Sequence, residues 1–88
     1  MNLSRASLRN AHFEDADLAG CDLREADLSH GHFRHADMRG ADLSGANLSH
    51  ADLRGCDLRG ALTEGVQTEG TNLQGASLAG TSLAALTD

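Results

Sequence analysis

Histidine and cysteine are the residues of this chain best suited to chemistry. The five histidines fall in one stretch of the sequence: His12, His30, His32, His35 and His50. Histidine can bind a metal or act as a general acid or base near neutral pH. Cys21 and Cys56 are far apart and form no Cys-x-x-Cys unit or Cys/His cluster of the zinc-finger type. The sequence also indicates no serine–histidine–aspartate site with a pocket, so we expect no enzyme activity.

Aspartate and arginine dominate the charged residues. The chain has 88 residues, a net charge of -6, and seven positive charges that are all arginine. An acidic surface argues against direct nucleic-acid binding, since phosphate contact needs a basic patch, and it permits a basic protein partner. No apolar run approaches the roughly 18 residues of a membrane span, and no signal peptide is recognised. Two lone thiols favour a reducing compartment, so we expect a cytoplasmic protein that does not contact a membrane.

A five-residue period places all of these side chains. Cut from Met1, the third position of the pentads is large and apolar in 15 of 17 cases. The first position is small almost throughout, and Cys21 and Cys56 take the place of alanine there. The second position holds seven of the nine aspartates, and the fifth holds nine of the ten glycines. No insertion or deletion breaks the frame.

This period fits neither of the standard secondary structures. On an α-helix, five residues advance about 500°, so successive leucines would step around every side. On a flat strand, an odd spacing would send alternate leucines to opposite faces. The consistent solution turns the chain once in each pentad, so that the first and third positions face a common axis. The other positions face water, and glycine at the fifth suits a corner.

Several pentads match the Ala-Asp/Asn-Leu-x-x unit of a known family, for example residues 16–20, 41–45 and 51–55. The whole chain resembles the pentapeptide-repeat family. The resemblance implies an all-β fold, a right-handed quadrilateral parallel β-helix with four pentads in each coil. Residues 1–88 then make one solenoid domain of about four and a half coils, in which each coil contacts only its neighbours. The expected core centres are Leu8, Phe13, Leu18, Leu23, Leu28, Phe33, Met38, Leu43, Leu48, Leu53 and Leu58.

In such a coil, residues i and i+20 stack, which aligns aspartates on the outside. The candidate interaction surface, called the acidic stripe below, consists of Asp17, Asp37 and Asp57 in one column and Asp22 and Asp42 in the next. Family members of the quinolone-resistance type resemble DNA in shape and charge and bind DNA gyrase. The resemblance therefore suggests a DNA-mimic-like binder of gyrase or another topoisomerase. The alternative is a solvated face with local ion pairs to Arg39 and Arg59, on a scaffold or targeting module of a larger protein.

The same stacking places His12 under His32 and His30 under His50. Imidazoles about 5 Å apart could hold a metal, but exposed turn residues are the commoner case. No carboxylate is clearly placed as a partner for these histidines. We therefore assign neither a metal nor a cofactor to the chain.

The pattern weakens after residue 60. Thr63 and Thr68 replace leucine and should face inward, where a buried hydroxyl costs about 1–3 kcal/mol unless it finds a partner. Leu62 should lie on the surface. We predict no capping helix at either end, and we expect residues 81–86 to form an apolar terminal surface. Bare coil edges recruit strands, so we expect the ends either to pair with a second copy or to continue into a longer parent protein.

Overall fold

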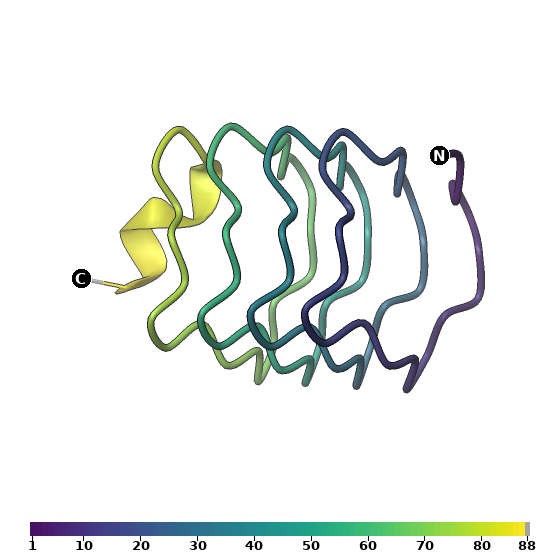
Figure 1. Cartoon of the computed structure of the whole chain (residues 1–88), viewed down its shortest axis with the longest axis horizontal. Helices are drawn as coiled ribbons and strands as arrows, with labels where there is room; N and C mark the ends of the chain where they lie inside the picture. The colour runs from purple at the N-terminus through teal and green to yellow at the C-terminus, as the bar shows by residue number, and fades with distance from the viewer. Residues whose placement is uncertain (88) are drawn as a thin grey trace.

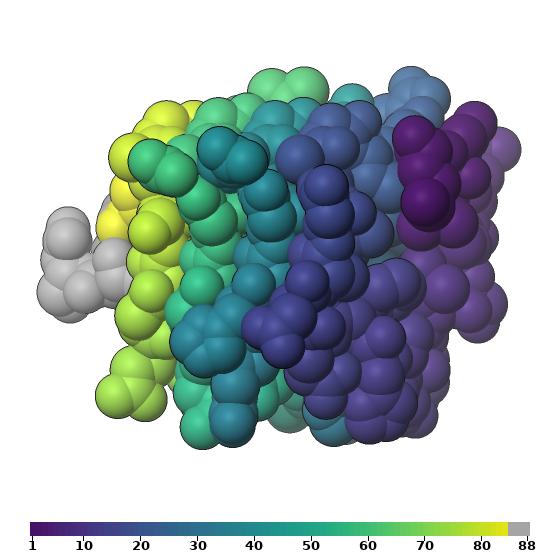
Figure 2. Space-filling model, viewed as in Figure 1, coloured from purple at the N-terminus to yellow at the C-terminus, as the bar shows by residue number. Residues whose placement is uncertain are grey.

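The chain forms a stack of coils with its two termini at opposite ends (Figure 1). The computed structural model describes the backbone of residues 1–87 and the side chains of residues 1–84. Parallel β-bridges link residues that are twenty apart, from Asn2–Asp22 at one end to Asp57–Ser77 at the other. One coil is therefore four pentads, as the resemblance implied. Figure 2 shows successive coils in close contact along one side of the stack.

Backbone hydrogen bonds join each coil to the next without forming long strands. The N–H of Leu28 donates to the carbonyl of Asn47 in the next coil (2.8 Å), and the N–H of Asp27 donates to the carbonyl of Ala6 in the previous one (2.9 Å). Within residues 1–87, each pentad contributes at most a single bridge residue, because the chain turns before a second can pair. The fold is a β-solenoid in which the ladders run along the axis. Its right-handed sense stays a prediction.

Every corner is a tight turn with a left-handed residue at the fifth position. The N–H of Ala41 donates to the carbonyl of Met38 (3.1 Å), and Gly40 between them has a φ of 67°. A positive φ at this place is what a type II turn requires, and glycine adopts it most easily. Other residues take the same conformation at seven corners: Arg5, Asn10, Asp15, Glu25, His30, His35 and His50.

The inward positions fill the axis of the solenoid. The expected core centres from Leu18 to Leu58 are each at most 5% exposed, whereas Leu8 and Phe13 in the first coil are only partly buried. Phe13 stacks on Phe33 with ring centroids 5.3 Å apart. Gly31 is the one glycine outside a corner, and a Cβ there would lie 2.4 Å from Cε2 of Phe33. The large ring of Phe33 therefore explains why residue 31 is glycine and not the alanine that is common at the first position.

A short helix covers the C-terminal end, so the prediction of an uncapped end is wrong (Figure 1). The 3-10 helix η1 spans Ser82–Thr87. Leu83 is buried within it, so the predicted apolar terminal surface is wrong for this residue, whereas Ala84 is exposed. The side chains of residues 85 and 86 lie outside the described part. The cap forms because Thr63 and Ser82 bind each other, with their hydroxyl oxygens 2.7 Å apart and the N–H of Ser82 donating to Oγ1 of Thr63 (3.1 Å).

The coil after residue 60, in which threonine replaces leucine at two of the third positions, otherwise keeps the five-residue pattern of inward and outward side chains. Thr63 is buried, Thr68 is half-buried, and Leu62 is 55% exposed. The bonds to Ser82 remove the penalty for burying the hydroxyl of Thr63. The five-residue register thus continues through residues in which leucine has been lost.

Candidate functional site

The acidic residues of the second position hold the turns in place. The N–H of Arg39 donates to Oδ1 of Asp37 (3.2 Å), two residues back along the chain. Aspartate and asparagine make this bond in ten pentads: Asn2, Asp17, Asp22, Asp27, Asp37, Asp42, Asn47, Asp52, Asp57 and Asn72. This is the Asx-turn, for which the carboxylate and the amide serve equally. The aspartates therefore have a structural role that the period alone did not reveal.

Arginine at the fourth position forms two hydrogen bonds to the same carboxylate. Nε of Arg39 donates to Oδ1 of Asp37 (2.9 Å), and Nη2 donates to Oδ2 (2.8 Å). The same two-point pair is present in four pentads: Asp22–Arg24, Asp37–Arg39, Asp52–Arg54 and Asp57–Arg59. The hydrogen bonds from the arginines lower the pKa of Asp37 and of Asp52 to about 2. Both carboxylates are thus ionised and paired at neutral pH.

The acidic stripe exists as a geometric column but much of its charge is matched. Bridges join Asp17 to Asp37, Asp37 to Asp57, and Asp22 to Asp42. Asp22, Asp37 and Asp57 each bind an arginine of their own pentad. Asp17 and Asp42 do not, although Nε of Arg24 lies 4.0 Å from Oδ2 of Asp42. The stripe is therefore a ladder in which charges of both signs alternate.

Mixed charge is a property of every side of the solenoid. The face with Asp17, Asp37 and Asp57 also carries Arg39 and Arg59, which leaves it a net charge of -1. The other three faces, with the corners that follow them, also contain residues of both signs. The net negative charge of the chain is consequently spread around the coil. No face of the described part is uniformly acidic.

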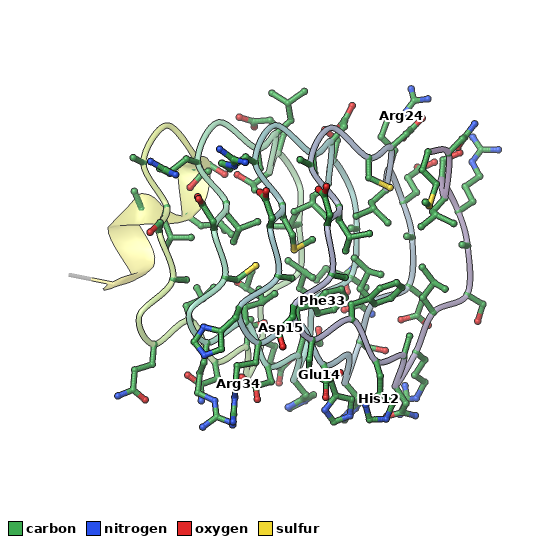
Figure 3. All side chains as sticks on the ribbon, viewed as in Figure 1. His12, Glu14, Asp15, Arg24, Phe33 and Arg34 are labelled. Atoms are coloured by element: carbon green, nitrogen blue, oxygen red, sulfur yellow. The ribbon has the colours of Figure 1, made fainter. Side chains whose placement is uncertain are left out.

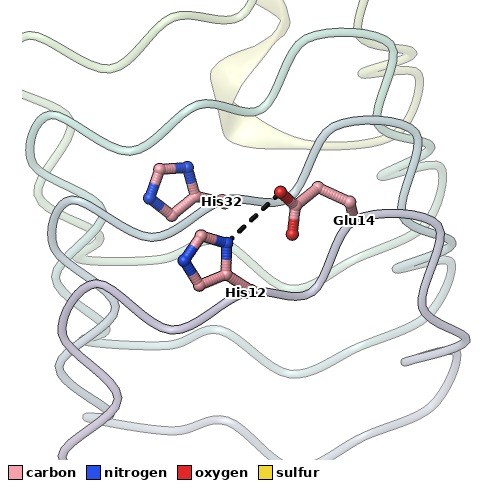
Figure 4. A group of neighbouring side chains, drawn as sticks. All are labelled: His12, Glu14 and His32. Atoms are coloured by element: carbon pink, nitrogen blue, oxygen red, sulfur yellow. Dashed lines mark hydrogen bonds and ion pairs between the residues drawn. The ribbon is translucent and has the colours of Figure 1, made fainter.

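The histidine columns form as predicted, with one addition. The rings of His12 and His32 are parallel with centroids 4.2 Å apart, and those of His30 and His50 are 5.0 Å apart. The expectation that no carboxylate accompanies them is wrong, because Oε2 of Glu14 lies 3.3 Å from Nδ1 of His12 (Figure 4). Glu14 is at the fourth position of the same pentad, which is the position from which arginine binds aspartate in other pentads. That two-residue spacing was the signal that sequence reasoning missed.

Comparison with protein families identifies the repeat. The pentapeptide-repeat model matches with eight copies over residues 2–40 and 21–60. The chain belongs to the pentapeptide-repeat family. The matched ranges end at residue 60, before the coil that contains Thr63 and Thr68. The comparison with curated proteins gives no match.

Solved structures of this family share the fold. The protein alr5209 from Nostoc Pcc 7120 is 48% identical with a TM-score of 0.84, over 85% of this chain and 62% of its own. Rfr23 from the cyanobacterium Cyanothece 51142 is 36% identical with a TM-score of 0.65, over 92% of this chain and 50% of its own. HetL, involved in heterocyst differentiation regulation in Nostoc sp. strain PCC 7120, is 31% identical with a TM-score of 0.68, over 91% and 48%. The chain thus spans less than two thirds of each of these relatives.

The thiols of this pentapeptide-repeat protein are unsuited to catalysis. Cys21 and Cys56 are free and buried. Burial raises the pKa of the Cys56 thiol to about 12, so the reactive thiolate is scarce at neutral pH.

Side chains divide between the interior and the outer surface of the solenoid. Phe33 points into the filled interior, whereas His12, Glu14 and Arg34 lie on the outside (Figure 3). Across residues 1–87, no helix is both long and apolar enough to span a membrane.

Proposed function

We propose that this chain is a non-catalytic protein-interaction module that contacts its partner through the outer faces of the solenoid. The observation that carries the proposal is the division between a filled interior and outward polar groups that bind one another. The core from Leu18 to Leu58 leaves the axis to side chains, so a substrate would have to bind outside. Hydrogen bonds between aspartates and arginines orient side chains on three of the four faces before a partner binds, which lowers the entropy lost on binding. We propose the cytoplasm as its compartment.

A scaffold or targeting module accounts for the charge distribution better than a DNA mimic. Duplex DNA carries about one negative charge for every 1.7 Å of its axis, counting both strands. On the stripe, Arg39 and Arg59 offset two of the three aspartates in the longer column. A partner of this surface must therefore match an alternating pattern of charges. We therefore place the scaffold first and the gyrase or topoisomerase binder second. The feature that favours the gyrase binder is the alignment of Asp17 with Asp37 and Asp57 in one column.

Direct binding to purified gyrase separates the two candidates. The triple variant Asp17→Asn, Asp37→Asn, Asp57→Asn removes the charge while asparagine keeps the turn bond, as Asn47 does. If the stripe mimics DNA, the chain competes with DNA for gyrase, competition weakens with salt, and the triple variant abolishes it. The matched control, Asp27→Asn with Glu69→Gln, removes negative charge from the opposite side and should compete normally.

The scaffold proposal is tested with a partner captured from cell extract, identified and purified. Four chains, each altered on a single face, are then compared for binding to that partner. Loss of binding in one of them, with an unchanged circular dichroism spectrum, supports recognition by a face of the solenoid. Equal binding by all four variants would contradict it.

A further inference from the structure

We propose that His12, Glu14 and His32 form a binding site for a divalent transition-metal ion such as Zn²⁺, on the outside of the first two coils (Figure 4). Each residue offers one ligand atom, and these atoms all lie within 4.8 Å of one another. Among the described residues, no other group of three potential ligands is so close. This site is independent of the protein-interaction role proposed above.

The ligand set matches the chemistry of zinc. Two imidazoles and one carboxylate bind Zn²⁺ in mononuclear sites that keep a fourth position open. Ligand atoms about 2.0–2.1 Å from a tetrahedral metal lie about 3.3 Å from one another. Nδ1 of His12 and Oε2 of Glu14 are 3.3 Å apart already. The side chain of His12 is 70% exposed and that of Glu14 is 45% exposed, so rotation of side chains can bring the nitrogen of His32 into range.

The backbone holds the two histidines at a fixed separation. His12 and His32 are paired in a parallel bridge. The N–H of Phe13 donates to the carbonyl of His32 (2.7 Å), and the N–H of His32 donates to the carbonyl of Ala11 (2.9 Å). The rings of Phe13 and Phe33, the residues that follow these two histidines, stack in the interior beside this column. Metal binding would therefore order only side-chain torsions, which keeps its entropic penalty small.

The histidines also depart from the structural pattern of the repeat. Elsewhere the second position commonly carries the aspartate or asparagine that accepts the turn N–H, and the pentads of His12 and His32 lack this bond. Two adjacent coils thus lack the hydrogen bond between the turn N–H and the second-position side chain. In its place, this column carries two imidazoles beside the carboxylate of Glu14.

Glu14 supplies the acidic group of the site, with its Oε2 3.3 Å from Nδ1 of His12. Arg34 lines the same shallow hollow, together with Asp52 and Arg54. Nη2 of Arg34 lies 3.9 Å from Oδ2 of Asp52, which Arg54 binds at 2.7 Å, so the two carboxylates and two guanidinium groups of the hollow balance in charge.

Isothermal titration of the full chain with ZnCl₂ in a non-chelating buffer tests the site. We expect one Zn²⁺ per chain, and a rise in Tm on binding because the metal joins two coils. His12→Asn and His32→Asn should abolish binding, and both variants should fold because asparagine restores the turn bond. Glu14→Gln should weaken binding about tenfold or more, since even residues that only support metal ligands are worth about 10- to 100-fold. Co²⁺ should give the visible absorption of a tetrahedral site in the wild type and in neither histidine variant.

The second histidine stack supplies the matched control. His50→Asn removes a ring from the His30–His50 pair, and asparagine tolerates the left-handed conformation of that corner. This variant should bind Zn²⁺ as the wild type does. The proposal is overturned if the wild type binds no zinc, if His12→Asn and His32→Asn leave the stoichiometry unchanged, or if His50→Asn loses binding to the same degree.

Discussion

The first three coils and the last coil fill the same axis with different chemistry. Up to residue 60 the third positions are large and apolar, and the family match covers this region. After it, Thr63, Thr68 and Thr71 place hydroxyl groups on inward positions. Oγ1 of Thr71 donates to the carbonyl of Leu48 (2.6 Å), and Thr63 binds Ser82 of the cap. Two of these three inward hydroxyl groups thus bind a partner, whereas Thr68, which is only half-buried, makes no side-chain hydrogen bond among those described.

The corners of the two regions differ as well. The last non-glycine residue with a positive φ at a corner is His50. From Gly55 through Gly80 every corner residue is glycine. Some of these side chains lie over the glycine of the next coil. A Cβ on Gly70 would be 2.4 Å from Nδ1 of His50, and one on Gly55 would be 2.5 Å from Nδ1 of His35. The later glycines thus provide space for the earlier side chains.

The largest contrast should come from equivalent leucines in the two regions. Leu53 is fully buried, whereas Leu73 in the same column is only partly buried. Leu53→Ala should lower the free energy of unfolding by about 2–5 kcal/mol, because it opens a cavity between packed coils. Leu73→Ala should cost clearly less. Urea denaturation measures both, and equal losses would show that the last coil is packed as tightly as the others.

Two glycine corners test the role of the side chains above them. Gly40 and Gly70 have nearly the same φ, 67° and 70°, but only Gly70 has a ring above it. Gly40→Ala should cost about 1–2 kcal/mol from the left-handed strain alone. Gly70→Ala should cost more, since the ring of His50 must move. Thermal melts that place the two variants at the same Tm would mean that the contact is irrelevant to stability.

The two threonines should respond in opposite directions. Thr63→Val removes a hydroxyl that holds the cap, and it should lower the free energy of unfolding by about 0.5–1.5 kcal/mol. Thr68→Leu adds apolar surface at a half-buried site without breaking any described hydrogen bond, and it should stabilise the chain by about 1 kcal/mol. Chemical denaturation of both variants measures the difference. Stabilisation by valine at Thr63 would contradict the assigned role of η1.

Acid should weaken the first three coils specifically, because all the arginines precede residue 60. Arg39 lowers the pKa of Asp37 to about 2, below its ordinary value. The contribution of this pair to stability is fully present above the ordinary value near pH 4, and it is lost as pH falls toward 2. Both Asp37→Asn and Arg39→Gln should flatten the fall in stability between about pH 4 and pH 2. An unchanged acid slope in these variants would exclude the pair as its source.

The five-residue period was enough to predict which side chains face the axis, because their direction follows from one turn in each pentad. The coil of four pentads came from the resemblance to the family, and it placed Phe13 on Phe33 and His12 on His32. The period did not predict the bonds within a pentad, since it treats Asp37 only as a residue that faces water. Those bonds depend on the local turn, where Oδ1 comes within reach of the N–H two residues later.

The cap was missed for a related reason. Leu83 occupies a third position, so the sequence frame continues through it as if another coil followed. Its side chain is buried in the helix as it would be in a coil, and the pattern therefore does not distinguish the two. The deciding contact joins Ser82 to Thr63, nineteen residues earlier, and depends on the last coil having already formed.

The central claim is that second-position aspartates are turn residues first and a charged surface second. Two triple variants at Asp17, Asp37 and Asp57 test it, one with asparagine and one with alanine. Both remove the carboxylates and their ion pairs, but only alanine removes the acceptors of three backbone N–H groups. We predict that the alanine variant unfolds at lower urea, with a free energy of unfolding about 1–4 kcal/mol below that of the asparagine variant. Equal stability of the two variants would contradict the account.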